Sequence, residues 1–415
     1  MKKSKKGEIK MDKVLKLSNK YKLDPSTIEA VDSIDSREGV VEVAHQLLNL
    51  MMKKEREFYL KEQGEDKANG YYDRKLASAL GNLGLTIPRA RSGNFRPSIM
   101  PDTWKRRDIS FDDFIHKLVL QSYSPNKIKT LLESMNMPYS VEQINEIKED
   151  LYTRAKELRG RELPDRAFCI YIDAYHTSIK SEETKKVCKA VIYSVIGIDL
   201  SGKKSLFGYY TLEGHETKED WISIFNDLIS RGLKRLMLVI SDDFSGLSDA
   251  ISNIFPNAEH QLCLVHLQRN VRKNLSKAKA SEFNHEIGLI KKQRSFETAL
   301  EMFTNLCDKY KKDNKTFIDY VLKKKNLYLN YLKFPTSIQK HIYTTNAVEN
   351  FNSRLEVSRV NSGGYFQSKK TADIAIFIIA DRLENTKWKR IMPRFIESEY
   401  EILQMFNLKF RREEL

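Results

Sequence analysis

Three acidic residues, each in a separate part of this chain, could together hold a divalent metal ion. Asp173 follows the apolar run 168–172, Asp242 comes just after the apolar run 236–240, and Glu349 lies in the helix-like stretch 344–352. A carboxylate at the end of a buried strand is held at the edge of a sheet, so two from neighbouring strands and a third from a packed helix could converge on Mg²⁺. That arrangement is suited to cutting and rejoining phosphodiester bonds.

Two further carboxylates compete for these roles. Asp243 is adjacent to Asp242, and could instead cap a helix that begins near Ser245. Glu356 follows Glu349 by seven residues and therefore shares nearly the same helical face. The pattern by itself leaves both alternatives open.

The charge of the chain favours a polyanionic partner. Its 415 residues include 71 basic and 56 acidic side chains, which gives a net charge of +15. Residues 261–340 hold 17 basic and 7 acidic side chains, so ten of the fifteen net charges lie in this segment. We expect the segment to follow DNA backbones, and the alternative is a solvated, lysine-rich helical surface.

Other features of composition point to the compartment. Four cysteines without paired spacing indicate a reducing environment, and no apolar run approaches the roughly 18 residues needed to span a bilayer. The start, Met1–Lys6, is basic and lacks the apolar stretch of a secretory signal. We expect a cytoplasmic, nucleoid-associated protein with no membrane partner, and residues 1–35 are predicted to be a flexible basic tail and start.

The first third of the chain is predicted to be mainly helical. Residues 36–110 should form a helical region with a helix over 36–63 and short strands between 71 and 100. In 111–160, Ser124-Pro125 is a helix start, and Ser140 with Gln143 makes a capping box after the break at Met137-Pro138. A helix, a short turn and a second helix make up the helix-turn-helix motif, which binds DNA. We therefore predict a helix-turn-helix-like DNA-binding region at 111–160.

The catalytic candidates lie in a region where strand-like and helix-like patterns of apolar residues alternate. Strands are predicted at 167–173, 187–198, 205–212, 235–241 and 261–265, with helices starting near Thr217 and Leu247. This order predicts an α/β RNase H-like catalytic core, preceded by the helical N-terminal DNA-binding region and interrupted by an all-α insertion. Residues 161–265 would be the first part of the core and 266–340 the basic all-helical insertion. Residues 341–415 would complete the core with the glutamate-bearing helix and C-terminal helices.

Several ordered motifs resemble the Mutator-type DDE transposase family of prokaryotic insertion sequences, over most of residues 40–400. The segment that begins at Ile172-Asp173 resembles the family's first-aspartate segment, and Ser241-Asp242 with Gly246-Leu247 resembles the second. The remaining matches are Gln261 to His266 with Arg269-Asn270 for the Cys-x-x-His signature, Thr344 to Glu349 with Asn352 for the glutamate segment, and the landmarks Gly81 to Pro88 and Lys387 to Phe395.

This resemblance implies that Asp173, Asp242 and Glu349 are the catalytic metal ligands, holding two Mg²⁺ ions for which Mn²⁺ could substitute. It favours Asp242 over Asp243, and the frame of Asn346 and Asn352 favours Glu349 over Glu356. Asn346 is expected beside the ligands rather than among them.

Cys263 and His266 could also be half of a zinc site. A structural zinc ion needs four ligands, and Cys169, Cys188 and Cys307 are isolated in the sequence. We therefore expect the pair to organise the surroundings of Asp242. His176 and His215 are placed near the predicted edge of the sheet, where a single histidine more often has a structural role.

The chain departs from the family after the glutamate, where several arginines usually follow. Only Arg354 and Arg359 stand in the stretch 352–359. These two, with Arg269, Arg272 and Lys273, are the predicted DNA-contacting residues. The absence of the other arginines leaves fewer positive side chains in this stretch to contact the DNA backbone. It bears on the strength of those contacts and on the activity of this copy.

The expected function is that of a DNA transposase that binds the terminal inverted repeats of its own element, cleaves their 3′ ends and transfers them to target DNA. Joining two ends requires at least two protomers, so a homodimer or larger complex on DNA is expected. Two alternatives remain: an RNase H-like, resolvase-like nuclease that cuts without joining, and an inactive DNA-binding derivative.

Overall fold

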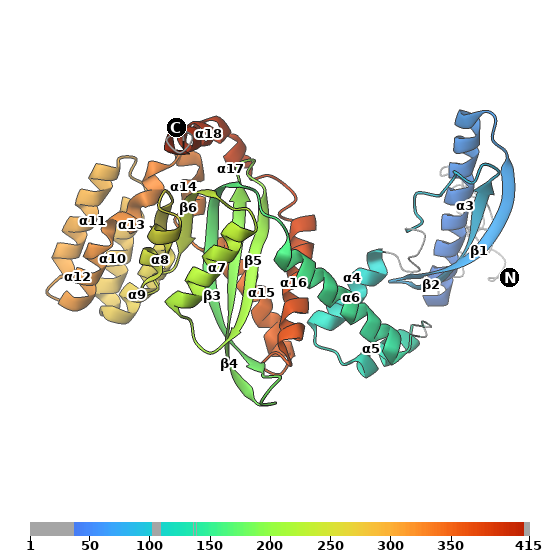
Figure 1. Ribbon diagram of the computed structural model, residues 1–415, viewed down its shortest axis with the longest axis horizontal. Helices are drawn as coiled ribbons and strands as arrows, with labels where there is room; N and C mark the ends of the chain where they lie inside the picture. The colour runs from blue at the N-terminus through green and yellow to red at the C-terminus, as the bar shows by residue number, and fades with distance from the viewer. Residues whose placement is uncertain (1–36, 102–108, 136, 138, 411–415) are drawn as a thin grey trace, which may run out of the picture. The chain divides into compact units, whose positions relative to one another are not determined.

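The computed structural model describes residues 37–101, 109–135, 137 and 139–410 (Figure 1). They form two compact units, one ending at Glu146 and one starting at Ile147, and the division falls inside a single helix. The predicted flexible tail, 1–35, lies outside the described residues. Among the helices that the structure describes, none has the length and apolar character needed to cross a membrane.

A helix and a hairpin begin the N-terminal unit. Helix α3 (Arg37–Gln63) packs on the antiparallel pair β1 (Ala68–Ser78) and β2 (Gly81–Ala90), around a small core that includes Met52 and Leu85. The predicted helix over 36–63 is confirmed. The predicted strands are confirmed as one hairpin, which ends at Ala90 and does not reach Met100.

Three helices follow the hairpin: α4 (Ile109–Leu120), α5 (Pro125–Glu133) and α6 (Val141–Gly160). The Ser124 side chain accepts a hydrogen bond from the Lys127 amide, and Pro125 opens α5. The Ser140 amide donates to Gln143 at 2.9 Å, while the Gln143 amide donates to the Ser140 hydroxyl at 3.2 Å. The predicted capping box is therefore present, because these two bonds satisfy amides that the first turn of a helix leaves unpaired.

A mixed five-stranded sheet is the centre of the second unit, with the order β5-β4-β3-β6-β7. Strands β3 (Arg166–Lys180), β4 (Val187–Asp199) and β5 (Lys204–Glu213) are antiparallel neighbours. Strands β6 (Arg235–Ser241) and β7 (Glu259–Leu262) run parallel to β3. The sheet therefore brings β3 and β6, the strands that lead to Asp173 and Asp242, side by side.

Helices cover both faces of this sheet (Figure 1). On one face, α7 (Lys218–Ser230) and α8 (Leu247–Ile254) bury Trp221, Phe225 and Ile251 against alternate residues of β3 and β4. On the other face, α15 (Asn346–Asn361) packs on β3 and β4, and α16 (Lys369–Asn385) packs on β5. Glu349 lies in the first turn of α15.

Between β7 and α15 the structure contains only helices as regular elements, and the C-terminal segment is also helical. The first group is α9 (Leu264–Asn274), α10 (Lys277–Ile290), α11 (Phe296–Tyr310), α12 (Lys315–Lys323), α13 (Lys325–Leu329), a 3₁₀ turn (Asn330–Lys333) and α14 (Thr336–Ile342). The second is α17 (Pro393–Ile396) and α18 (Glu399–Phe410).

Two predicted strand boundaries are wrong. Strand β3 does not end at Asp173 but continues to Lys180, because its antiparallel pairing with β4 extends to Val187 and satisfies the backbone of the polar half. The strand predicted at 261–265 is β7 and ends at Leu262. Cys263 instead precedes the first turn of α9, and the Leu264 amide donates to the carbonyl of Tyr343 at 3.0 Å.

Candidate active site

Asp173 lies in the middle of β3, at the point where pairing with β6 stops. Tyr171 pairs with Ile240 in the parallel register, so two further residues along each strand place Asp173 opposite Asp242. One carboxylate oxygen of Asp173 accepts a hydrogen bond from the Asn352 amide group at 2.8 Å, and Asn352 in turn accepts one from the Ser194 hydroxyl at 2.9 Å. Asp173 is thus fixed by β4 and α15 as well as by its own strand.

Two side chains from α9, His266 and Arg269, lie against Asp242 and Glu349. His266 Nδ1 lies 2.5 Å from Asp242 Oδ1, and His266 Nε2 lies 3.3 Å from Glu349 Oε1. Arg269 Nη1 lies 2.6 Å from the same Glu349 oxygen and 2.8 Å from His266 Nε2. Both side chains therefore contact the same Glu349 oxygen, and His266 also reaches Asp242, so α9 ties the end of β6 to α15.

Cys263 and Thr345 lie behind this bridge. The buried thiol of Cys263 accepts hydrogen bonds from the amide of Thr345 at 3.4 Å and from its hydroxyl at 3.3 Å. The same hydroxyl is 3.3 Å from Asp242 Oδ1 and 3.4 Å from His266 Nδ1. Thr345 is fully buried and is the residue before the first turn of α15, so the Cys-x-x-His pair fixes where that helix begins.

The two rival carboxylates point to other partners. Asp243 forms an ion pair with Lys324 at 2.5 Å and accepts a hydrogen bond from Tyr328, both in the helical segment after β7. It does not cap α8, the alternative role that the sequence left open, since Gly246 (φ 81°) is the residue before that helix and no side chain caps it. Glu356 pairs with Arg359 at 2.5 Å and also bonds Tyr175.

A further carboxylate, which sequence reasoning missed, lies at a cavity that Asp173, Asp242 and Asp243 line and Glu349 does not. Glu216 lies with Asp173 and Asp242 around a cavity of about 240 Å³. Its side chain is only 12% exposed, accepts a hydrogen bond from the Trp221 indole at 2.8 Å and lies 3.4 Å from His176 Nε2. The sequence signal was a carboxylate three residues beyond the end of β5, the same kind of position that singled out Asp242.

The crowding of charge perturbs several groups. Burial, and then the charge of Asp242, raises the pKa of Asp173 to about 6. Burial also raises the pKa of Glu216, and Asp242 adds to this effect. Burial opposes the charge of His266, but hydrogen bonds with Asp242 and Cys263 outweigh it and raise the pKa of His266 to about 10.

The donor set fits a hard divalent cation better than zinc. The cavity is lined by carboxylates on β3, directly after β6 and before α7, and oxygen donors with room for water suit Mg²⁺. Asp242, Cys263 and His266 also offer three potential ligand atoms within 4.8 Å of one another. A structural zinc ion takes four ligands, and within the part of the chain that the structure describes no fourth His, Cys, Asp or Glu joins this cluster.

The predicted DNA-contacting residues differ in their surroundings. Arg269 and Arg359 are held by Glu349 and Glu356, as described above, whereas Arg272 and Lys273 are exposed in the last turn of α9. Arg354 contacts Asn350 within α15 at 3.4 Å. Asn346 is exposed at the start of α15, and Asn352, not Asn346, is the asparagine that donates to Asp173.

Comparison with known proteins gives consistent matches. The model of the family described as "Transposase, Mutator family" matches residues 14–390. The transposase for insertion sequence element IS1201 of Lactobacillus helveticus is 27% identical over 316 residues, covering 75% of this chain and 83% of that protein. The transposase for insertion sequence element IS905 of Lactococcus lactis is 27% identical over 289 residues, covering 69% and 72%. A probable transposase for an ISRM3-like element of Sinorhizobium fredii is 24% identical over 347 residues, covering 83% and 85%.

Proposed function

Because this chain belongs to the Mutator family of transposases, we propose that it cuts the 3′ ends of its own insertion sequence and joins them to target DNA at the site of Asp173, Asp242 and Glu349. The observation that carries the proposal is that strand register places Asp173 opposite Asp242, which His266 links to Glu349 on α15. The strand order β5-β4-β3-β6-β7, antiparallel then parallel, is the order expected of an RNase H-like core. The helices from α9 to α14 would be the insertion in that core.

Asp173, Asp242, Glu349 and Glu216 are the residues that would hold Mg²⁺. Two bound ions would activate the attacking oxygen and stabilise charge on the leaving oxygen. Asn352 donates a hydrogen bond to Asp173, and Thr345 donates one to Asp242. Hydrogen-bond partners of this kind orient the residues that bind a metal. His266 and Arg269 offset the repulsion among the carboxylates and are placed to meet a DNA phosphate.

A strand-transfer assay tests this proposal. Purified protein, Mg²⁺, a duplex carrying the element's terminal repeat and a plasmid target should yield the element end joined covalently to the plasmid. Cleaved ends without joined product would favour a structure-specific nuclease, and neither product would indicate a DNA-binding derivative.

We further propose that helices α5 and α6 read the terminal repeats, and that two or more protomers assemble on DNA at the nucleoid.

The Glu216→Gln variant is expected to bind Mn²⁺ more weakly by roughly 10-fold or more, the scale at which groups supporting a metal site act. The substitution keeps the shape and the contact with Trp221 but removes one negative charge from the cavity. Calorimetric titration with Mn²⁺ measures the affinity without any need for turnover. Glu219→Gln, an exposed carboxylate in the first turn of α7, is the matched control. Equal affinity in Glu216→Gln and wild type would remove Glu216 from the metal site.

Exposed lysines near the junctions of α9 with α10 and of α11 with α12 are expected to hold DNA backbone. Asn314 donates to the carbonyl of Asn274 at 3.2 Å, which brings the two junctions together. The surrounding lysines that are exposed are Lys273, Lys277, Lys312 and Lys315. Changing these four to Gln should weaken binding to element-end and unrelated DNA alike and reduce the salt dependence by roughly 0.9 logarithmic units per lost contact. Fluorescence anisotropy over a salt series measures both quantities, and an unchanged slope would make this patch a solvated surface.

A further inference from the structure

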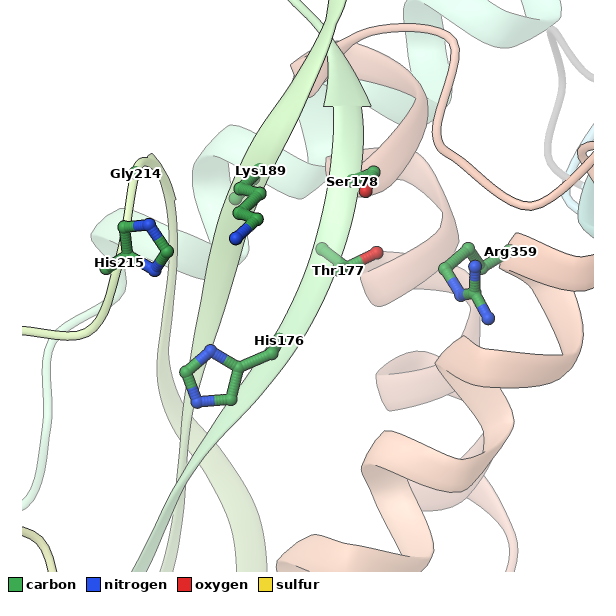
Figure 2. A pocket seen from close by; sticks show the side chains of 8 residues that line it. His176, Thr177, Ser178, Lys189, Gly214, His215 and Arg359 are labelled. Carbon is green, nitrogen blue, oxygen red and sulfur yellow. The ribbon is translucent and has the colours of Figure 1, made fainter.

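The pocket shown in Figure 2 has polar side chains that face in opposite directions. It lies at the extended end of the β3–β4 pair and has a volume of about 390 Å³. Thr177 and Arg359 lie on one side of β3, whereas His176, Lys189 and His215 lie on the other side, so they do not meet on one ligand. A different group of polar side chains does converge, where β6 ends beside β7.

His260 is a buried histidine in that group. It lies on β7 opposite Val239 of β6 and is 6% exposed. Its Nε2 lies 2.7 Å from the hydroxyl of Ser241, the last residue of β6. Its Nδ1 is buried and has no hydrogen-bond partner in the ranges that the structure describes. The contact of this imidazole is therefore with the residue that precedes Asp242.

The Ser241 hydroxyl is bonded to a backbone carbonyl. It donates to the carbonyl oxygen of Asp242 at 2.8 Å, and the amide of Phe244 donates to the same oxygen at 3.2 Å. That oxygen belongs to the peptide between Asp242 and Asp243. A serine hydroxyl bonded to nearby backbone restricts the local backbone conformation. These two hydrogen bonds therefore fix the orientation of that peptide.

The peptide sets the directions of two adjacent carboxylates. The Asp242 side chain meets His266, and the Asp243 side chain meets Lys324. Because the peptide unit is planar, its rotation changes the ψ angle of Asp242 and the φ angle of Asp243 together. A rotated peptide would therefore move both carboxylates away from these partners.

The directions of the hydrogen bonds assign the proton of His260. Ser241 has one hydroxyl proton, and the carbonyl of Asp242 can only accept, so the hydroxyl must accept from the Nε2–H of His260. Burial lowers the pKa of His260 to about 4, although the charge of Asp243 opposes this effect. The ring is therefore neutral, with its proton on Nε2. A proton on Nδ1 would instead be a buried donor with no acceptor within the described residues.

We propose that His260 is a positioning residue for the metal site, because its Nε2–H holds the Ser241 hydroxyl on the carbonyl of Asp242 and so fixes the direction of the Asp242 carboxylate. This inference rests on the proposed function, which makes Asp242 a ligand of Mg²⁺. His260 is not among the residues that line the cavity, whereas Ser241 is. His260 therefore acts on Asp242 through Ser241.

A double-mutant cycle with Ser241 tests this inference. His260→Leu keeps a side chain in the core and removes the Nε2–H. Calorimetric titration of full-length protein should show Mn²⁺ binding weaker by about 3- to 10-fold, less than the loss expected for a group that contacts a ligand directly. Ser241→Ala should give a similar loss. In the Ser241→Ala background, His260→Leu should add little further loss, because the link to Asp242 is already broken.

A conservative variant and a matched control distinguish positioning from packing. The amide of His260→Gln can donate from near the position of Nε2, so this variant should bind Mn²⁺ as wild type does. Gln339 is also buried and donates to the carbonyl of Phe334. Gln339→Leu should lower the melting temperature and leave Mn²⁺ affinity unchanged.

The tautomer provides a readout that needs no metal. In ¹⁵N NMR spectra of histidine-labelled protein, the His260 signals are those that disappear in His260→Gln. They should show a protonated Nε2 and an unprotonated Nδ1. An unprotonated Nε2 would overturn the inference, because the imidazole could not then donate to Ser241.

The outcomes also separate this inference from the proposed function. Equal losses for His260→Leu in the wild-type and Ser241→Ala backgrounds would make His260 a packing residue. Wild-type Mn²⁺ affinity in His260→Leu, in a protein whose wild type performs strand transfer, would overturn only this inference. Should His260→Leu fail to fold, wild-type affinity in Ser241→Ala would overturn it in the same way. A wild type that neither binds Mn²⁺ nor cleaves an element end would overturn the proposed function and this inference with it.

Discussion

Asp173→Asn, Asp242→Asn and Glu349→Gln are each expected to abolish Mg²⁺-dependent cleavage of an element end while leaving binding of that end largely intact. Each change keeps the size of the side chain and removes one of the charges that would hold the metal. The expected loss is at least roughly 100-fold, the scale for removing one electrostatic group from an active site. Gel analysis of a labelled end duplex measures cleavage, and anisotropy in EDTA measures binding.

Neighbouring carboxylates provide matched controls for these variants. Asp243→Asn should retain cleavage, because Asp243 is turned toward Lys324 and Tyr328. It should lose about 1.5–3 kcal/mol of unfolding free energy, since a hydrogen bond to a charged group is broken. Glu356→Gln should also retain cleavage, although it releases Arg359. Activity in Asp242→Asn together with inactivity in folded Asp243→Asn would reverse the choice between the two neighbours.

The second large effect is expected at His266, where the Ala variant should lower cleavage or joining by about 10-fold or more. The imidazole contacts both Asp242 and Glu349, so its removal frees two ligands that the fold holds together. Single-turnover cleavage rates measure the loss, and thermal melting should change only modestly. His285→Ala, an exposed histidine on α10, should behave as wild type.

Elemental analysis for zinc decides between the two interpretations of the Cys-x-x-His pair. Purified wild-type protein should contain no stoichiometric zinc by elemental analysis, since Cys263 and His266 are already engaged by Thr345 and Asp242. A molar equivalent of zinc that disappears together with the fold in Cys263→Ser would contradict this assignment. The pair would then be a structural metal site rather than a support for the carboxylates.

Local sequence signals were sufficient for most elements of the fold. The alternation and apolar runs predicted β4, β5 and β6, and the helical pattern that starts near Thr217 predicted α7. These signals depend only on residues in or next to each element. The end of β3 was misplaced because its polar half, 174–180, has no apolar pattern of its own. That half is a strand because β4 pairs with it, and a pairing partner is a tertiary property.

The sequence by itself determined the kinds of side chain available to the site: three carboxylates that follow apolar runs or lie on a helix, and a Cys-x-x-His pair in the order that resembles the family. Only the tertiary structure decided which of them face one another. Asp242 and Asp243 are adjacent in the chain, yet one meets His266 and the other meets Lys324, 81 residues further on. Glu216 joins the cavity, and Asn352 rather than Asn346 holds Asp173, because strand register and helix packing set distances between residues far apart in the chain. No local pattern records those distances.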